Sequence, residues 1–328
     1  MLGTEVGAAG LSDPVKLVIG AGGIYSAFLY YGSLQEDVFQ YTAPDGTHFK
    51  QAWFLQVLEA IANIVVGFVG LQFSGGTKGL PLKMFALSGS SQVSAKAFTS
   101  LALANGLSFP VATLAKSGKM APVMAGSLLL GGAKYSVREY LQVLAIIAGT
   151  AIVSMGKKKG GGSSSSGLGV FFIIISLAAD GITGGIQKKL KEDCAKAGVR
   201  PKPYDFMFWT NLFMALTACV FSISLGEVST GAYYIAENPE ILSKITRFAI
   251  CSAVGQSFIF FTIANFEPLV CTTVTTTRKI LSVLLSIFTK GHSLNAHGWG
   301  GIALATGGIL AEMESKVLNS RKNSILKT

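Results

Sequence analysis

Charged residues are scarce in this sequence. Asp, Glu, Lys and Arg make up 13% of its 328 residues, about half their share in soluble globular domains. Hydrophobic residues make up 50%, and the mean hydropathy is +0.52. This composition argues against a water-soluble enzyme, because apolar runs of about 20 residues require lipid. We therefore predict an all-α integral membrane protein.

Cysteine and histidine are also few, with four and three residues. The cysteines are unevenly spaced and three lie in apolar runs, which predicts neither a disulfide framework nor a metal site. The phosphate-binding loop GxxxxGK[ST] is missing, which argues against an ATPase motor. We expect no metal, no cofactor and no nucleic acid partner, and we attribute the net charge of +10 to membrane topology and anionic cargo.

Ten apolar runs are long enough to cross a bilayer. Ser, Thr, Lys and Gly dilute the third, fourth and eighth runs, so nine helices is the nearest alternative to ten. The runs cover residues 14–34, 51–73, 83–105, 107–130, 138–155, 168–187, 205–226, 244–264, 266–289 and 297–313.

The ten runs form two sets of five. Polar landmarks recur between the sets: Lys119 and Lys279 are 160 residues apart, and Gly32–Gln35 has a counterpart in Gly184–Gln187. A repeat of five helices must be inverted in its second copy, because five is odd. Inverted repeats are the usual architecture of secondary transporters, with the binding site between the repeats.

This pattern predicts ten transmembrane helices in two inverted five-helix repeats. The predicted divisions are a first repeat at 1–156, a linker of three Lys and then Gly and Ser at 157–167, a second repeat at 168–313 and a cytosolic tail at 314–328.

Basic residues outside the runs or near their ends predict the orientation of the chain. With both termini in the cytosol, fifteen Lys and Arg residues lie on the cytosolic side and seven on the other, three of which are Lys157–Lys159. Because cytosolic loops carry an excess of Lys and Arg, we predict that both termini are cytosolic.

Five basic residues lie away from the ends of the predicted spans: Lys96, Lys116, Lys119, Arg278 and Lys279. Burying each costs at least about 2.5 kcal/mol, so such residues usually serve a function. Four of them form two pairs at matching places in the two halves. Lys116 and Lys119 of the first pair are three positions apart, which predicts one helical face. The adjacent members of the second pair splay by about 100°, and the repeat nominates Lys279 as the one that faces the cavity.

Two interpretations of these cations remain open. They either reach the membrane surface or pair with acids, for which Glu59, Asp180, Glu267 and Glu312 are available. Alternatively they bind a ligand with several negative charges, such as a di- or triphosphate, because Arg and Lys are the usual partners of phosphate. The acids are few and scattered, which favours the ligand.

Other polar residues in the spans offer less specific chemistry. Glutamine amides could contact a base or a sugar, Tyr31 could stack on a ring, and threonines could line a cavity; bonds between helices or to their own backbone explain them equally well. The candidate base or sugar contacts are Tyr31, Gln35, Gln187, Gln256, Thr276 and Thr277.

Several short motifs resemble the nucleotide-sugar transporter family within the drug/metabolite transporter superfamily. Two of them, Gly255–Phe260 and Thr275–Lys279, are similar to solute carrier family 35, in its UDP-galactose transporter-related subgroup B. The motifs are Tyr31–Glu36, Ala115–Met124, Asp180–Gly181 with Gln187, Gly255–Phe260 and Thr275–Lys279. In one departure, Ser108–Val111 reads Ser-Phe-Pro-Val where the subgroup has Asn-Tyr-Pro-Thr.

The resemblance implies ten helices, antiport of a cytosolic nucleotide conjugate against a lumenal nucleotide, and residence in the endoplasmic reticulum or Golgi membrane. It also implies that Lys116, Lys119, Arg278 and Lys279 contact the phosphates of the cargo. We therefore expect UDP-galactose or UDP-glucose to exchange against UMP, without enzymatic activity. The alternatives are an ATP/ADP exchanger of the endoplasmic reticulum membrane and a transporter of the sulfate donor PAPS.

Overall fold

The computed structural model describes residues 12–122, 124, 135–155, 167–266, 268–292 and 294–325. In this part of the chain the named secondary-structure elements are all helices, and Thr42 and His48 form an isolated bridge. This confirms the all-α prediction. The helices are α1 (Asp13–Gln40), α2 (Ala52–Ser74), α3 (Leu82–Ala104), α4 (Phe109–Ser117), α6 (Val137–Met155), α7 (Gly167–Lys196), α8 (Pro203–Ser224), α9 (Glu227–Glu237), α10 (Pro239–Asn265), α11 (Pro268–Thr289) and α12 (Ala296–Ile325).

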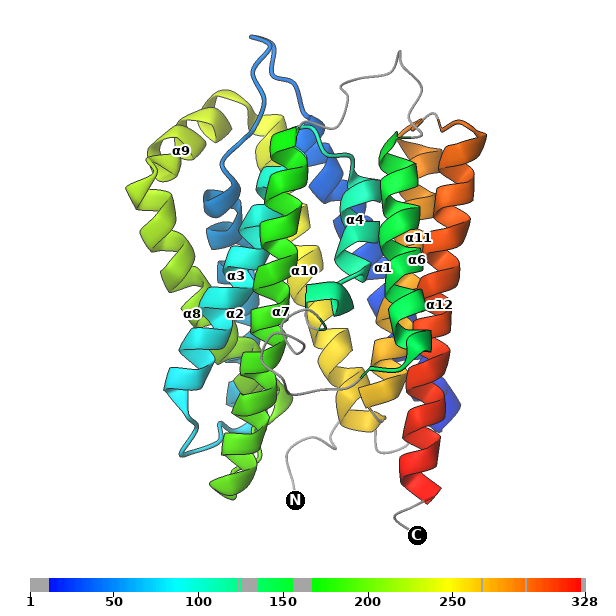
Figure 1. The fold of residues 1–328 in the computed structure, drawn as a ribbon. Helices are drawn as coiled ribbons and strands as arrows, with labels where there is room; N and C mark the ends of the chain where they lie inside the picture. The colour runs from blue at the N-terminus through cyan, green and yellow to red at the C-terminus, as the bar shows by residue number, and fades with distance from the viewer. Residues whose placement is uncertain are drawn as a thin grey trace.

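Most of the helices stand side by side in one bundle (Figure 1). Among the described helices, seven are long and apolar enough to cross a membrane: α1, α2, α6, α7, α8, α10 and α11. Their outer faces carry exposed apolar side chains, such as Phe68 and Phe73 on α2 and Val220 on α8. Such a surface is stable in lipid and not in water, so the chain is a multi-pass membrane protein.

Each predicted span overlaps a helix, but the helices differ from the predicted spans in several places. The 11-residue α9 lies between the seventh and eighth spans, where no helix is predicted, and α10 begins at Pro239. Glu227 of α9 accepts hydrogen bonds from the backbone N–H groups of Trp53 and Phe54, at 2.7 and 3.0 Å, and so caps the first turn of α2. The short α9 lacks an apolar run of about 20 residues, so hydropathy alone did not predict it.

The last helix also extends beyond its predicted span. It continues through the predicted tail to Ile325. Figure 1 places the start of α1 and the end of α12 at the same end of the bundle, which we call the terminal end; the loop at 41–51 and α9 lie at the opposite end. Residues 157–166 of the predicted linker lie outside the described residues, as does Glu267, whereas its last residue, Gly167, begins α7.

The predicted fourth span is interrupted. Its helix α4 ends at Ser117, and a turn at Gly118 and Lys119 follows before Met120–Pro122 become helical again. The backbone N–H of Gly118 bonds the carbonyl of Ala115 at 2.9 Å, an i to i−3 bond that tightens the last turn. The helical face expected to carry both lysines therefore ends between them.

The two halves of the chain interleave. The most extensive contacts join α6 to α12, α2 to α8, α3 to α7 and α1 to α10. Glycine permits the closest of these approaches: a Cβ on Gly149 of α6 would lie 2.5 Å from the Ala305 nitrogen of α12. Small residues bring membrane helices into close packing in this way.

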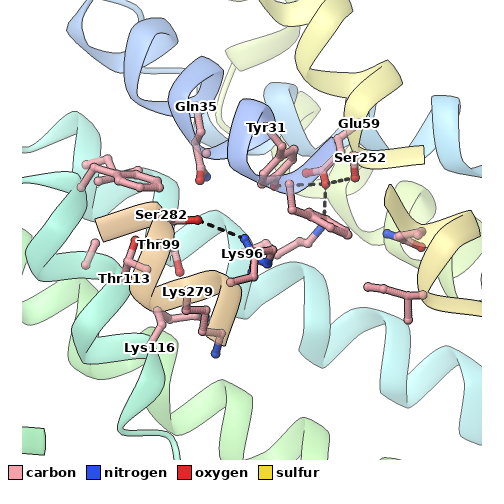
Figure 2. Close-up of a pocket in the computed structure, with 18 of the residues that line it drawn as sticks. Tyr31, Gln35, Glu59, Lys96, Thr99, Thr113, Lys116, Ser252, Lys279 and Ser282 are labelled. Atoms are coloured by element: carbon pink, nitrogen blue, oxygen red, sulfur yellow. Dashed lines mark hydrogen bonds and ion pairs between the residues drawn. The ribbon is translucent and has the colours of Figure 1, made fainter. Parts of the chain in front are cut away.

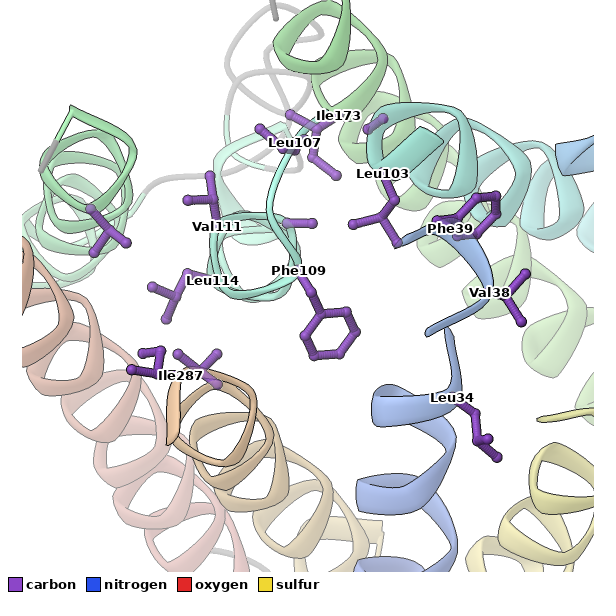
Figure 3. Close-up of a cluster of buried hydrophobic side chains, with 14 of the residues drawn as sticks. Leu34, Val38, Phe39, Leu103, Leu107, Phe109, Val111, Leu114, Ile173 and Ile287 are labelled. Atoms are coloured by element: carbon purple, nitrogen blue, oxygen red, sulfur yellow. The ribbon is translucent and has the colours of Figure 1, made fainter. Parts of the chain in front are cut away.

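A buried apolar cluster lies toward the end of the bundle opposite the termini, where α1, α3 and α11 end and α4 begins. Figure 3 shows part of this cluster. Leu34 and Phe39 of α1, Leu103 of α3, Phe109 of α4 and Ile287 of α11 all belong to it, and each is less than one tenth exposed. The cluster therefore ties both halves together just beside the cavity described next.

Candidate substrate-binding cavity

A cavity of about 410 Å³ lies in the middle of the bundle (Figure 2). Side chains of α1, α2, α3, α4, α10 and α11 line it, so both halves of the chain contribute. Its apolar walls include Phe28, Phe109 and Phe260, with Gln35 and Gln256 among the polar groups. A mostly apolar cavity with a few converging polar groups is the usual form of a small-molecule site.

Four of the five intramembrane cations line this one cavity: Lys96, Lys116, Arg278 and Lys279. The sequence separates Lys116 from Arg278 by more than 160 residues, and the contact of α4 with α11 brings them together. Arg278 and Lys279 both line the cavity, although adjacent residues splay on a helix and only Lys279 was expected to face it.

Two of the four cations are paired with carboxylates. The Nζ atom of Lys116 lies 2.5 Å from Asp180 Oδ2 and also donates to the Ser176 hydroxyl at 3.0 Å. The Nζ atom of Lys96 lies 2.6 Å from Glu59 Oε1. The acids are therefore close enough to neutralise these two lysines, contrary to the expectation that they are too scattered.

Glu59 is the centre of a buried network (Figure 2). Its side chain is 2% exposed, and Oε1 accepts hydrogen bonds from Lys96, from Ser252 at 2.6 Å and from Tyr31 at 3.2 Å. The donors come from α3, α10 and α1, so the carboxylate of α2 joins four helices. Ionised carboxylates only accept hydrogen bonds, and this arrangement supplies several donors to one oxygen.

The other two cations have no carboxylate partner among the described residues. Arg278 donates to the Ser282 hydroxyl at 3.4 Å and lies 5.0 Å from the ring centroid of Phe28, while its buried Nε atom has no hydrogen-bond partner. Lys279 makes no hydrogen bond or ion pair within the part of the chain that the structure describes. A buried cation without a partner is costly, so these two residues leave an unmet demand for negative charge.

Some of the remaining predicted site residues line the cavity and others do not. Tyr31, Gln35 and Gln256 line the cavity. Lys119 is exposed in the turn after α4 and is not part of the lining.

The two predicted threonines lie outside the cavity. Thr276 faces a small recess against Glu312 and Lys316 of α12. Thr277 bonds the Tyr25 hydroxyl at 2.5 Å and the backbone carbonyl of Thr273 at 2.9 Å. Such bonds to the preceding turn are common for threonine in helices.

Gln187 lies in a second cavity, of about 310 Å³, that adjoins the first. The two cavities share Gln92, Gln256 and Phe260 in their linings. A third cavity, near the end of α7, shares Lys191 with the second. The three together form a series that runs from the centre of the bundle toward the terminal end.

The opposite end of the central cavity is closed by polar contacts as well as by the apolar cluster. His292 Nε2 lies 2.6 Å from Oε1 of Glu36, which is 2% exposed, and Lys290 Nζ lies 2.5 Å from Asp37. The Ser286 hydroxyl donates to the other Glu36 oxygen at 2.6 Å. His292 thus joins the loop after α11 to α1.

Sequence reasoning missed several contributors to the site. Phe28, Gln92 and Ser282 line the cavity, but their residue types are too common in membrane helices to be noticed. Lys96 and Glu59 could have been paired from the scarcity of charge in the spans, because each needs a partner there. Among the described residues, no group of three His, Cys, Asp or Glu side chains is placed to hold a metal ion.

Comparison with known proteins identifies relatives along most of the chain. Residues 16–316 match the UAA transporter family. Solute carrier family 35 member B1 of Dictyostelium discoideum is 32% identical, over 96% of this chain and 81% of that protein. UDP-galactose/UDP-glucose transporter 3 of Arabidopsis thaliana is 29% identical, over 93% and 94% of the two chains. The matched family and these relatives are transporters and not enzymes.

A solved crystal structure of a protein with 15% sequence identity also shares the fold. Its TM-score is 0.54, over 94% of this chain and 99% of that chain. At this identity the likeness concerns the fold alone.

Proposed function

Because this chain belongs to the UAA transporter family, we propose that it is a nucleotide-sugar antiporter. It moves UDP-galactose or UDP-glucose from the cytosol into the lumen of the endoplasmic reticulum or Golgi in exchange for UMP. The observation that carries this proposal is the convergence of Lys116, Arg278 and Lys279 on one central cavity, two of them without a carboxylate partner. The Arabidopsis relative bears the name of a transporter of the same two nucleotide sugars.

The cations bind the phosphates in different ways. Arg278 presents a planar guanidinium, which can hold two phosphate oxygens at once. Lys279 and Lys116 act as point charges from α11 and α4. Lys119, exposed beside the break in α4, contributes attraction at the edge of the site. The phosphates are carried and not hydrolysed.

The base and the sugar bind beyond the phosphates. Tyr31, Gln35 and Gln256 supply an aromatic face and amide groups in the central cavity, and Gln187 supplies an amide in the adjoining one. Thr276 and Thr277 lie behind this surface on α11 and shape the helix that carries the cations.

The carrier consists of two inverted five-helix repeats, α1, α2, α3, α4 and α6 against α7, α8, α10, α11 and α12. The packing supports this division: α3 packs on α7 and on α8, and its counterpart α10 packs on α1 and on α2. Three other contacts, α2 with α8, α4 with α11 and α6 with α12, each join a helix to its own counterpart. Such a pattern is expected around a two-fold axis.

Alternating access moves the cargo between the two sides. The series of cavities runs to the terminal end, and the apolar cluster with the Glu36–His292 pair closes the other end. With cytosolic termini, this is the state that accepts a nucleotide sugar from the cytosol. The cation cluster favours crossing when loaded, because an empty site leaves Arg278 and Lys279 unpaired, and this yields obligatory exchange.

Counterflow in proteoliposomes tests the proposal. Vesicles preloaded with UMP should take up UDP-galactose or UDP-glucose, and Lys279→Ala should reduce uptake at least tenfold because it removes an unpaired cation from the site. Parallel loading with ADP or AMP, against external ATP or PAPS, covers the other cargoes. Uptake of ATP against ADP without any uracil exchange would refute the proposed cargo, and equal uptake into empty vesicles would refute obligatory exchange.

A further inference from the structure

The cavity carries fewer free charges than its four cations suggest. Lys96 is neutralised by Glu59 at 2.6 Å and Lys116 by Asp180 at 2.5 Å. Four cations and two carboxylates leave two free positive charges, those of Arg278 and Lys279. Lys119 is exposed in the turn after α4 and is not part of the lining, so it attracts the cargo at the edge of the site and is not counted among the charges inside the cavity.

We propose that Glu59 and Asp180 are built-in counterions that set the charge of the transported molecule at two negative charges. This inference rests on the proposed function and deepens it. A nucleoside monophosphate carries about two negative charges above its second pKa near 6, and the diphosphate of a UDP-sugar carries about two as well. Both partners of the exchange therefore match the free charge of the site, whereas nucleoside triphosphates, with about four, do not.

The charge of the cargo must match the free charge of the site because the cargo passes through a closed state. When neither end of the cavity is open, site and cargo are together removed from water, and each unbalanced charge has a large desolvation cost. A dianion brings the site close to neutrality. Exchange of one dianion for another also moves no net charge across the membrane.

Of the two ion pairs, Glu59–Lys96 gives the clearer test of the inference. Both residues line the cavity, but Lys96 is 26% exposed, whereas Glu59 is 2% exposed and accepts hydrogen bonds from Tyr31 and Ser252. The cargo thus meets a lysine whose charge is already balanced. Without Glu59, the same lysine becomes a third free cation in an otherwise unchanged cavity.

Substitutions that change only the charge test the inference. The measurement is inhibition of UMP exchange in proteoliposomes by UMP, UDP and UTP at pH 8, without divalent cations. Wild-type protein should prefer UMP to UTP. In Glu59→Gln, which keeps the size of the side chain, the affinity for UDP relative to UMP should rise about tenfold, equivalent to about 1.4 kcal/mol. Asp180→Asn should shift the ratio in the same direction by freeing Lys116.

The double variant Glu59→Gln with Lys96→Gln is the matched control. It lacks the ion pair but regains the wild-type charge, so its UDP-to-UMP ratio should return to the wild-type value. A ratio within one variant does not depend on how much protein is folded. An unchanged ratio in both Glu59→Gln and Asp180→Asn would overturn the inference, as would a double variant shifted as far as the single one.

The proposed function can fail separately. If wild-type protein exchanges no uracil nucleotide, the cargo assignment is wrong, and the same comparison is made with AMP, ADP and ATP. A wild-type preference for ATP over AMP would then overturn the charge rule too, whereas a preference for AMP that Glu59→Gln reverses would support it.

Discussion

Arg278 and Lys279 differ in what the cavity offers them. The Arg278 guanidinium lies over the Phe28 ring, with Ser282 as its hydrogen-bond acceptor, whereas Lys279 has no partner in the described part of the chain. Arginine can therefore be held in place before cargo binds, with its fork already oriented. Lysine supplies charge and little geometry. The two adjacent cations are thus expected to contribute in different ways.

Arg278→Lys tests this difference. The substitution keeps the charge but loses the planar fork and its contact with Phe28, so the apparent affinity for UMP should fall about tenfold. Concentration-dependent exchange in proteoliposomes measures this, with Lys279→Arg as the matched variant, for which a smaller loss is expected. Wild-type affinity in Arg278→Lys would show that position 278 needs charge alone.

At the scale of helices, the interruption of α4 is the decisive feature. The helix ends at Ser117, so Lys116 lies in its last turn and Lys119 in the turn that follows. Broken helices near the centre of a transporter expose backbone and side chains to the cargo. Here the break separates two lysines that an unbroken helix would hold on one face.

The contact between α6 and α12 depends on glycine, which has no side chain to hold the two helices apart. A Cβ on Gly149 would lie 2.5 Å from the Ala305 nitrogen and 2.6 Å from the Gly301 oxygen, which are backbone atoms that cannot move aside. We expect Gly149→Ala to destabilise the protein by about 1–3 kcal/mol, typical of overpacking, and to lower its thermal midpoint in detergent by several degrees.

Gly300→Ala is the control for this prediction. Gly300 lies on the same α12 helix and is exposed, and an added Cβ would have no heavy atom within 4 Å. Because Ala favours helix over Gly by about 1 kcal/mol, its midpoint should stay the same or rise. Equal midpoints for the two variants would show that α6 and α12 are not tightly packed.

At the scale of the whole molecule, the two ends of the bundle are unequal. Toward the terminal end the cavities follow one another to Lys191. At the other end, the apolar cluster is reinforced by the Glu36–His292 and Asp37–Lys290 pairs. Alternating access requires these contacts to separate, so weakening them should shift the population toward the opposite opening.

Glu36→Gln provides the test. It removes the charge that holds His292 and weakens the acceptor for Ser286. In a variant with the four native cysteines replaced, Leu107→Cys should react several-fold faster with an impermeant maleimide from the end opposite the termini. Leu107 is 3% exposed within the cluster, so its reactivity reports opening.

Gln187→Cys is the complementary probe, because it lies in the cavity toward the terminal end. Its labelling from the terminal side should slow in the Glu36→Gln background, because a molecule that is open at the opposite end is closed at the terminal end. If neither cysteine changes its rate, the Glu36–His292 pair does not hold that end closed.

The sequence by itself determined the helical membrane class, because runs of about 20 apolar residues have no other stable setting. It also identified the cations, because charge in lipid is rare enough to be conspicuous: Lys96, Lys116, Arg278 and Lys279 all line one cavity. The proposed doubling of the chain and its cargo rest on the same kind of pattern.

Only the tertiary structure decided which of those cations are free. Pairing depends on distances between helices, and nothing in the sequence places Asp180 beside Lys116 or Glu59 beside Lys96. The break after Ser117 and the short α9 could not be predicted from the sequence for a related reason, because packing and capping override local hydropathy. Composition shows that charge is present in the membrane, but the fold determines how much of it is left for a ligand.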